Sequence, residues 1–195
     1  FYLNNCPSDR WGIISKKFNL KLNDWNAFNE DAPILVALQF PNDASLRGCN
    51  ITEWAFEVSQ QIRSVSKRKI IIRFPQLDKL YEKKWINKLR TIEDLHFQMG
   101  TKKNLVPTLK KCHCSVTYTS GLAVDSLING CPTITCNEGS FCYEVSQNSA
   151  FEVEEIKYFD RRQWIYNLSY CQWDLNEIKS GEAWRHIKSI VHSIN

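Results

Sequence analysis

Polar residues follow three apolar stretches of this 195-residue chain, and their chemistry suits the binding of an anion. The segment Gln39 to Ser45 supplies amide, carboxylate and hydroxyl groups, Arg73 supplies a guanidinium, and Thr119 to Gly121 supplies hydroxyls and backbone N–H groups. If the apolar stretches are parallel strands, their carboxyl ends share one edge of a sheet. Together these groups predict a site for a phosphate or a diphosphate.

The stretch Ser115 to Thr135 carries the most explicit local signals. It reads as a strand, a Thr119-Ser120-Gly121 turn, a short helix that stops at Asn129-Gly130, and a second strand opened by Pro132. Such a turn directs free N–H groups and two hydroxyls toward one point, where the helix dipole favours an anion. Asp125, one turn into the helix, could reach a ribose hydroxyl, although a solvated aspartate is the simpler interpretation. The alternative for the whole stretch is an ordinary strand-to-helix crossover.

Several familiar motifs are absent from the sequence. It contains no Gly-x-Gly-x-x-Gly, no P-loop and no Gly-x-Ser-x-Gly, which argues against ordinary dinucleotide binding, P-loop NTPases and α/β-hydrolases. The four histidines are scattered, and His113 reads as an interior strand residue rather than as a base. No Asp-x-Asp pair is present, so the sequence identifies no catalytic residue and requires no metal.

The eight cysteines do not form a recognisable pattern. A chain of this length with alternating strands and helices does not need disulfides, unlike a small secreted scaffold. Cys114, Cys131 and Cys171 lie where small buried residues are usual. The C-x-C and C-x4-C spacings between Cys112 and Cys136 do not match the paired C-x2-C of zinc sites. We therefore expect reduced thiols, no cofactor and a cytoplasmic protein.

The alternation of short apolar runs with helical patterns predicts the fold class. Buried strands are expected at Pro33–Gln39, Lys69–Pro75 and Leu95–Phe97, before the two strands of Ser115 to Thr135. Helical patterns begin near Asn50, cover Leu77–Leu89 and Leu105–Lys111, and return at the C-terminal end. We expect an α/β fold, with a Rossmann-like, mainly parallel sheet flanked by helices.

Three parts of the chain are expected. Residues 1–31 form an irregular leading segment, residues 32–160 a Rossmann-like core, and residues 161–195 C-terminal helices packed on that core. Cys136 to Asn148 reads as a long loop and a candidate lid. No apolar run approaches the roughly 20 residues that span a bilayer. Because the chain starts at Phe1 without a Met or a signal-like segment, we expect a processed or excised piece.

Positive charge is concentrated in the middle of the sequence. Residues 63–111 carry 14 lysines and arginines against four acidic residues, while the whole chain has a net charge of +4. Such a region could face an anionic substrate or a nucleic acid. Solvated helix faces that carry Lys79, Lys83, Lys84 and Lys88 account for much of the charge without a partner.

Five segments of the chain carry a family resemblance: Val36 to Leu46, Ile71 to Pro75, Thr119 to Pro132, Gln163 to Trp173, and Gly181 to Arg185. They resemble capsular-polysaccharide-type glycosyltransferases of the GT-B fold, a family that includes the bacterial Kdo transferases of capsule export and small phage-type relatives. The resemblance spans nearly the whole chain. It implies the carboxyl-terminal, donor-binding half of such an enzyme, with a nucleotide-sugar as substrate.

The family pattern also implies roles for individual residues. The implied donor-site residues are Gln39, Asp43 and Ser45, with Thr119, Ser120 and Gly121 on the donor phosphate. Phe74-Pro75 stands where the family often has His-Pro, and the adjacent Arg73 would supply the positive charge. Asp125 stands where many GT-B enzymes carry a glutamate for the ribose. The catalytic base of GT-B enzymes usually comes from the other domain, so an N-terminal domain of the same parent chain is expected as a partner.

Three functions remain open at the level of the sequence. The first is a glycosyltransferase donor-binding domain that transfers a sugar from a nucleotide-sugar to a glycan or another acceptor. The second is a phage-type glycosyltransferase that acts on modified DNA bases, for which residues 63–111 would face the phosphate backbone. The third is a non-catalytic module that binds a nucleotide or a glycan.

Overall fold

The computed structural model describes residues 5–75 and 80–194, with side chains as far as residue 189. The chain forms two compact units, one of Lys21–Phe159 and one that joins residues 1–20 to residues 160–195. The sequence-based division into 1–31, 32–160 and 161–195 stays a prediction. The structure adds that residues 1–20 of the leading segment belong to the same unit as the trailing segment, whereas residues 21–31 belong to the larger unit.

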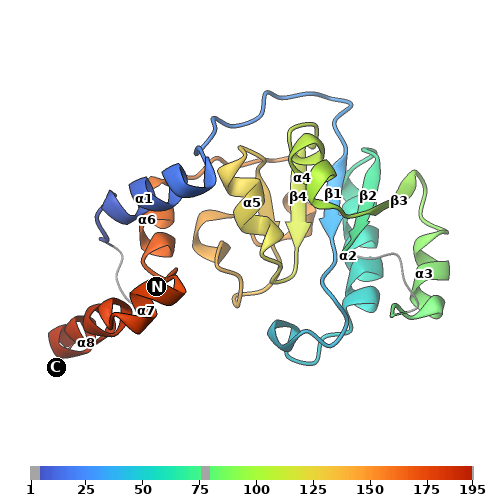
Figure 1. Ribbon diagram of the computed structural model, residues 1–195. Coiled ribbons are helices and arrows are strands. Elements are labelled where there is room, and N and C mark those ends of the chain that lie inside the picture. The colour runs from blue at the N-terminus through green and yellow to red at the C-terminus, as the bar shows by residue number, and fades with distance from the viewer. Residues whose placement is uncertain (1–4, 76–79, 195) are drawn as a thin grey trace. The chain divides into compact units, whose positions relative to one another are not determined.

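The described residues of the larger unit form one sheet of five parallel strands (Figure 1). The strands are β1 (Ile34–Ala37), β2 (Ile70–Phe74), β3 (Leu95–Met99), β4 (Cys114–Thr117) and β5 (Thr133–Thr135). Their order across the sheet is β3-β2-β1-β4-β5, and every neighbouring pair is parallel. The predicted α/β fold with a Rossmann-like parallel sheet is confirmed.

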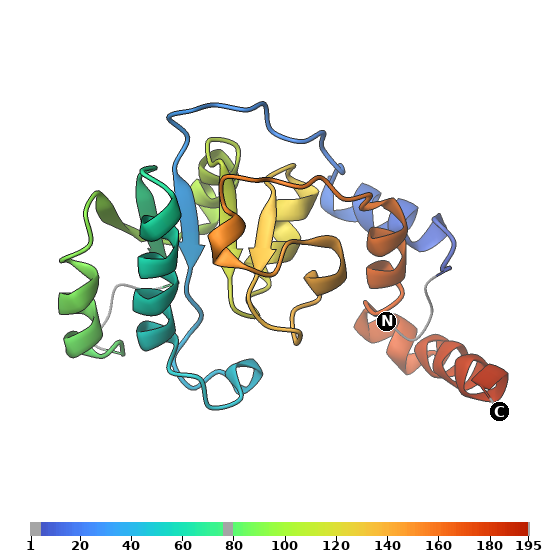
Figure 2. The ribbon, with the colours of Figure 1, turned by 180° about the vertical axis from the view of Figure 1, so that it is seen from behind.

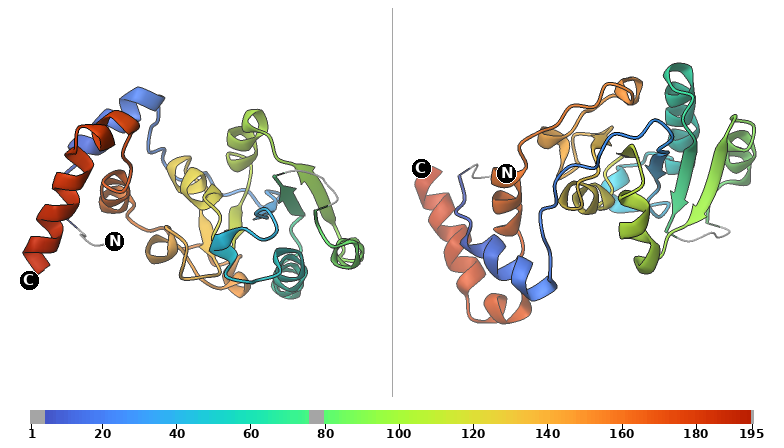
Figure 3. Two further views of the ribbon diagram at one scale, coloured as in Figure 1. Left: turned by 60° about the horizontal axis from the view of Figure 1, so that its bottom comes forward. Right: turned by 90° about the horizontal axis from the view of Figure 1, so that it is seen from above.

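Helices cover both faces of the sheet, as Figures 2 and 3 show. One face carries α2 (Ile51–Val65), α3 (Lys83–Leu89) and the 3-10 helix η3 (Ala150–Glu152). The other carries α4 (Lys102–Leu109) and α5 (Leu122–Ile128).

Two of these helices differ from their predicted bounds. The helix predicted over Leu77–Leu89 falls partly on residues 76–79, which lie outside the described residues, and the described helix α3 begins at Lys83. Helix α4 begins earlier than predicted, at Lys102, because Thr101 and Asn104 form a capping box that satisfies its first N–H groups.

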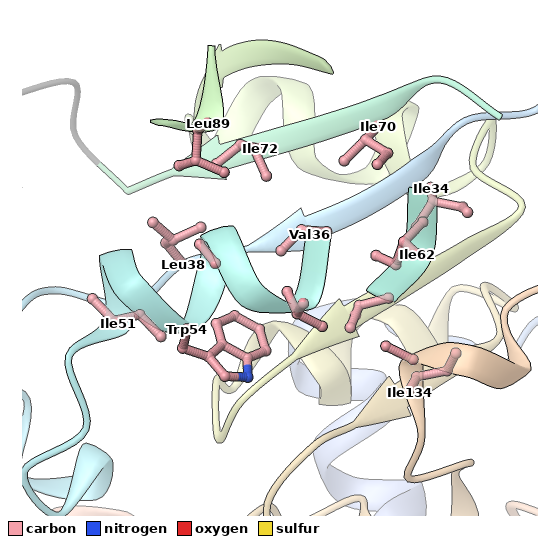
Figure 4. Packing of buried hydrophobic residues seen from close by; sticks show 14 of the residues in the cluster. Ile34, Val36, Leu38, Ile51, Trp54, Ile62, Ile70, Ile72, Leu89 and Ile134 are labelled. Carbon is pink, nitrogen blue, oxygen red and sulfur yellow. The ribbon is translucent and has the colours of Figure 1, made fainter. Parts of the chain in front are cut away.

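The central strand β1 is buried on both faces, as its continuous apolar run predicts. Ile34 and Val36 lie on the α2 side, where Trp54 and Ile62 pack in the same cluster (Figure 4). Leu35 lies on the opposite face, in a cluster with residues of α4. The apolar core therefore continues through the sheet and holds the strand ends in a fixed frame.

The strand order places a topological switch point between β1 and β4. The chain runs outward from β1 through β2 to β3, and then returns to lay β4 on the other side of β1. The connection after β1 leads to α2 on one face, and the connection after β4 leads to α5 on the opposite face. These two connections diverge at the carboxyl edge, and ligands of open α/β sheets bind at such a point.

The smaller unit consists of α1 (Asp9–Phe18), α6 (Arg162–Ser169), α7 (Leu175–Lys179) and α8 (Glu182–Ile194), all labelled in Figure 1. Helix α1 corrects the expectation of an irregular leading segment over residues 1–31. Gly12 lowers the helix propensity of this segment. Contacts with residues more than 150 positions away stabilise it instead.

A buried arginine is the centre of the smaller unit. The Arg10 guanidinium binds both carboxylate oxygens of Glu177, each at 2.8 Å. Its Nε donates to the carbonyl oxygens of Ser169 and Gln172, both at 2.9 Å. The guanidinium also lies 3.7 Å from the centre of the Trp173 ring. Arg10 thereby joins α1 to the turn after α6 and to α7.

His113 and five of the eight cysteines are buried, whereas Cys171, expected at a buried position, is exposed because it lies beyond the end of α6. His113 is buried beside β4, with Nε2 2.8 Å from the Val153 carbonyl oxygen, and burial lowers its pKa. All eight cysteines are free thiols, and burial raises the pKa of Cys112 to about 12. No group of residues that could hold a metal occurs in the described parts of the chain. Within the same parts, every helix is too short or too polar to cross a bilayer.

Candidate functional site

Gln39 links the two connections that diverge at the switch point. It lies two residues beyond β1, and its Oε1 accepts hydrogen bonds from the Thr119 N–H and the Thr119 hydroxyl, both at 3.1 Å. Its Nε2 donates to Ser45 Oγ at 2.8 Å. One amide side chain therefore ties the turn after β4 to the loop after β1.

Asp43 and Ser45 complete this hydrogen-bonded group. The Ser45 hydroxyl donates to Asp43 Oδ1 at 2.6 Å, and the Ser45 N–H donates to the same oxygen at 2.9 Å. These hydrogen bonds hold the pKa of Asp43 below its usual range, so the carboxylate is ionised at neutral pH. The Thr119 hydroxyl also lies 3.2 Å from Ser45 Oγ. We call Gln39, Asp43, Ser45 and Thr119 the switch-point cluster.

The turn at 119–121 presents fewer free groups than the sequence predicts. The Thr119 N–H is occupied by Gln39, and the Ser120 hydroxyl accepts a hydrogen bond from the Leu122 N–H at 3.2 Å. The N–H groups of Ser120 and Gly121 make no hydrogen bond with any residue that the structure describes. Two adjacent N–H donors beside the cluster are therefore available to a ligand.

Arg73 does not join the switch-point cluster, contrary to the expectation of a shared guanidinium. It lies on the sheet face that α4 covers, and Nη1 donates to Gln98 Oε1 at 2.9 Å and to Asn104 Oδ1 at 2.8 Å. Nη2 donates to the Thr101 carbonyl oxygen at 2.9 Å. Arg73 is 6% exposed, and burial lowers its pKa. These contacts anchor the start of α4 to β2 and β3, and they leave the guanidinium committed to the protein.

Asp125 is an exposed residue of the first turn of α5. Its side chain makes no hydrogen bond with a described residue, and its backbone carbonyl accepts from Asn129 Nδ2 at 2.8 Å. The structure shows no contact between Asp125 and the switch-point cluster. A contact between Asp125 and a ribose stays a prediction.

The loop after β5 adds residues that the sequence did not single out. Asn137 Nδ2 donates to the Tyr118 hydroxyl at 3.0 Å, and Asn137 Oδ1 accepts from the Gly139 N–H at 2.9 Å. A Cβ at position 139 would lie 3.4 Å from Thr119 Cγ2, so the loop approaches the turn closely. The Asn-x-Gly spacing, which favours a tight turn, is the signal that could have singled out Asn137 and Gly139 within the predicted loop. Whether residues 136–148 move as a lid stays a prediction.

A hydroxyl beneath the cluster has no partner. Thr117 is the last residue of β4 and is fully buried. Its Oγ1 makes no hydrogen bond with any atom of the described residues, although buried hydroxyls are normally paired. The carboxyl end of β4 therefore combines an unpaired hydroxyl with the free N–H groups of Ser120 and Gly121.

A pocket of about 460 Å³ lies beside Asp43 on the α2 side. The loop after β1, the first residues of α2, and Leu80 and Glu82 line it. Its volume falls in the range of about 300–1,000 Å³ that is usual for small-molecule sites.

Comparisons with known proteins give a likeness of fold at low similarity. No family model and no curated protein matches the sequence. The structure is similar to the UDP-GlcNAc 2-epimerase of Methanocaldococcus jannaschii, with a TM-score of 0.47 and 11% identity over 84% of this chain and 50% of that one. The same enzyme in complex with UDP-GlcNAc and UDP gives a TM-score of 0.46 and 14% identity, over 83% of this chain and 47% of that one. The structure of accessory secretory protein 1,2 and 3 in Streptococcus pneumoniae gives a TM-score of 0.40 and 14% identity, over 90% of this chain and 37% of that one.

The chain therefore spans about half the length of the epimerase structures that it resembles. Similarity at this level assigns neither a substrate nor an activity, because one fold hosts many functions.

Proposed function

We propose that the Lys21–Phe159 unit is the donor-binding half of a GT-B glycosyltransferase and binds a nucleotide-sugar at the carboxyl edge of its sheet. The observation that carries the proposal is the hydrogen-bonded cluster of Gln39, Asp43, Ser45 and Thr119, which joins the two connections at the switch point. Ligands of open α/β sheets bind at this place. The sequence resemblance to capsular-polysaccharide-type glycosyltransferases supports the same residues.

In this proposal, the N–H groups of Ser120 and Gly121 bind a phosphate oxygen of the donor. Adjacent backbone N–H groups suit a phosphate because they donate without the entropy cost of ordering a long side chain. No basic side chain belongs to the switch-point cluster, and Asp43 carries a negative charge. We therefore expect modest affinity for a bare nucleotide, with a weak dependence on salt.

The proposed reaction transfers the sugar of the donor to a glycan or another acceptor. The part of the Lys21–Phe159 unit is to hold the nucleotide and to stabilise its phosphate as the sugar departs. The catalytic base and the acceptor site belong, in this proposal, to an N-terminal domain of the same parent chain.

Thermal unfolding with a panel of UDP-, GDP- and CMP-sugars tests the proposal. At least one compound at saturating concentration should raise the melting temperature by about 2–5 °C, because ligand that binds only the folded state stabilises it. Ser120→Trp should abolish that rise by filling the space beside the free N–H groups. The control is Ser64→Trp on the exposed surface of α2, which should retain it. The proposal is wrong if no member of the panel raises the melting temperature.

A further inference from the structure

The pocket beside Asp43 has a mixed polar and apolar lining. Leu80 contributes apolar surface and is 53% exposed, whereas Leu46 and Ile51 also line the pocket but are each only 1% exposed. Asn50 caps α2 through its Oδ1, which accepts from the N–H groups of Thr52 and Glu53, and its Nδ2 donates to Glu82 Oε1 at 2.6 Å. The walls are therefore held in place by the start of α2 and by the residue that precedes α3.

A threonine hydroxyl at this pocket makes no hydrogen bond with the described residues. Thr52 is 2% exposed, and its side chain makes no hydrogen bond with any residue that the structure describes. A ligand group that accepts or donates one hydrogen bond would supply the partner that the Thr52 hydroxyl lacks.

The backbone around the pocket adopts an uncommon conformation. Asn42, Arg47 and Gly48 have φ values of 65°, 49° and 86°, and two of these three residues are not glycine. Left-handed backbone at non-glycine residues is unfavourable, and it persists where the surrounding structure enforces it. The loop that closes the pocket is thus held in one shape by its contacts rather than by its own preference.

The charge of the lining selects among ligands. Asp43 and Glu82 place two acidic side chains at the pocket, and none of the described residues that line it is basic. Carboxylates accept hydrogen bonds from hydroxyl groups, and amides both accept and donate them, whereas a second anion beside the carboxylates would be repelled. The lining therefore suits an uncharged, polyhydroxylated ring.

We propose that this pocket binds the sugar of the donor and that it selects an uncharged sugar over an acidic one. The inference rests on the proposed function and names its substrate class. Asp43 belongs both to the pocket and to the switch-point cluster, so a single nucleotide-sugar can place its phosphates at Ser120 and Gly121 and its sugar beside Thr52. Acidic sugars are disfavoured by this lining.

Isothermal titration with UDP, UDP-glucose and UDP-glucuronate tests this proposal, because the last two differ only at C6 of the sugar, where a carboxylate replaces the hydroxymethyl group. UDP-glucose should bind about tenfold more tightly than UDP, and UDP-glucuronate about tenfold more weakly than UDP-glucose. Thr52→Val should weaken UDP-glucose about fivefold and leave UDP unchanged. The matched control is Thr108→Val on α4, across the sheet, which should change neither. GDP and GDP-mannose repeat, for a purine nucleotide, the comparison between a nucleotide and its uncharged nucleotide-sugar.

Two outcomes contradict the proposal, and they are distinguishable. Equal binding of UDP-glucose and UDP-glucuronate, or equal weakening of UDP and UDP-glucose by Thr52→Val, overturns the sugar pocket and leaves the nucleotide site standing. If neither the nucleotides nor the nucleotide-sugars bind, the proposed function fails, and the sugar pocket fails with it.

Discussion

Gly130→Ala is expected to destabilise the larger unit by about 4 kcal/mol, a large effect for a single methyl group. Gly130 follows α5 with a φ of +82°, a region that disfavours residues with a Cβ. A Cβ at this position would also overlap the backbone carbonyl oxygen of Asp24. The segment before β1 packs here, because the Asn26 N–H donates to the Gly130 carbonyl oxygen at 2.7 Å. Urea denaturation of the full chain would measure the change.

Gly48→Ala provides the matched control for Gly130→Ala. Gly48 has a similar φ of +86°, but no atom lies within 4 Å of a Cβ built there. We expect a loss of only about 1 kcal/mol, which is the backbone strain alone. Equal effects of the two substitutions would show that the contact with Asp24 does not decide the stability of this region.

Arg10→Met is expected to destabilise the smaller unit by about 3 kcal/mol. The substitution preserves the apolar stem of the side chain but removes the guanidinium that donates to the Glu177 carboxylate and to two carbonyl oxygens. It also removes the stacking on Trp173. Hydrogen exchange of the backbone amides in α1, α6 and α7 would report the loss, with exchange about 100-fold faster if these amides open with the unit.

The surface pair Lys17–Asp174 supplies the control in the same unit. Its atoms lie 3.1 Å apart, and both side chains are well exposed, so Lys17→Met should change stability by less than about 1 kcal/mol. Similar exchange rates in Arg10→Met and Lys17→Met would contradict the role assigned to Arg10.

The Arg10–Glu177 ion pair also predicts a dependence of stability on pH. The hydrogen bonds from Arg10 hold the pKa of Glu177 below its ordinary value. A carboxylate with a lowered pKa stabilises the fold above its ordinary pKa of about 4.3, and this contribution is lost as the pH falls through the lowered value. The stability difference between the wild type and Arg10→Met should therefore be constant near neutral pH and should shrink in acid.

The strands could be predicted from the sequence because each is a short apolar run between turn residues. The run at Ile34–Ala37 has no polar face, which indicates a strand covered on both sides, and the structure places it at the centre of the sheet. The Asn129-Gly130 stop and the Thr119–Gly121 turn lie where local chemistry puts them. These features depend on neighbours in the sequence, so the sequence is sufficient for them.

Arg73 and α1 could not be predicted, because distant residues decide both. Arg73 alternates with Ile72 and Phe74 and so lies on the opposite face of β2, where the residues around the start of α4 bind its guanidinium. Helix α1 depends on Arg10 and its partners on the far side of the sequence. The sequence places Gln39 and Thr119 at the same sheet edge, but only the structure shows that one amide joins them.

The most direct test of the central claim is to locate the bound nucleotide by NMR. The backbone amide signals of the 15N-labelled chain would be followed as UDP-glucose or GDP-mannose is added. We expect the largest shifts on Ser45, Thr119, Ser120 and Gly121, the residues at and beside the switch-point cluster. Shifts centred on the opposite edge of the sheet or on the smaller unit, with these four amides unchanged, would contradict it.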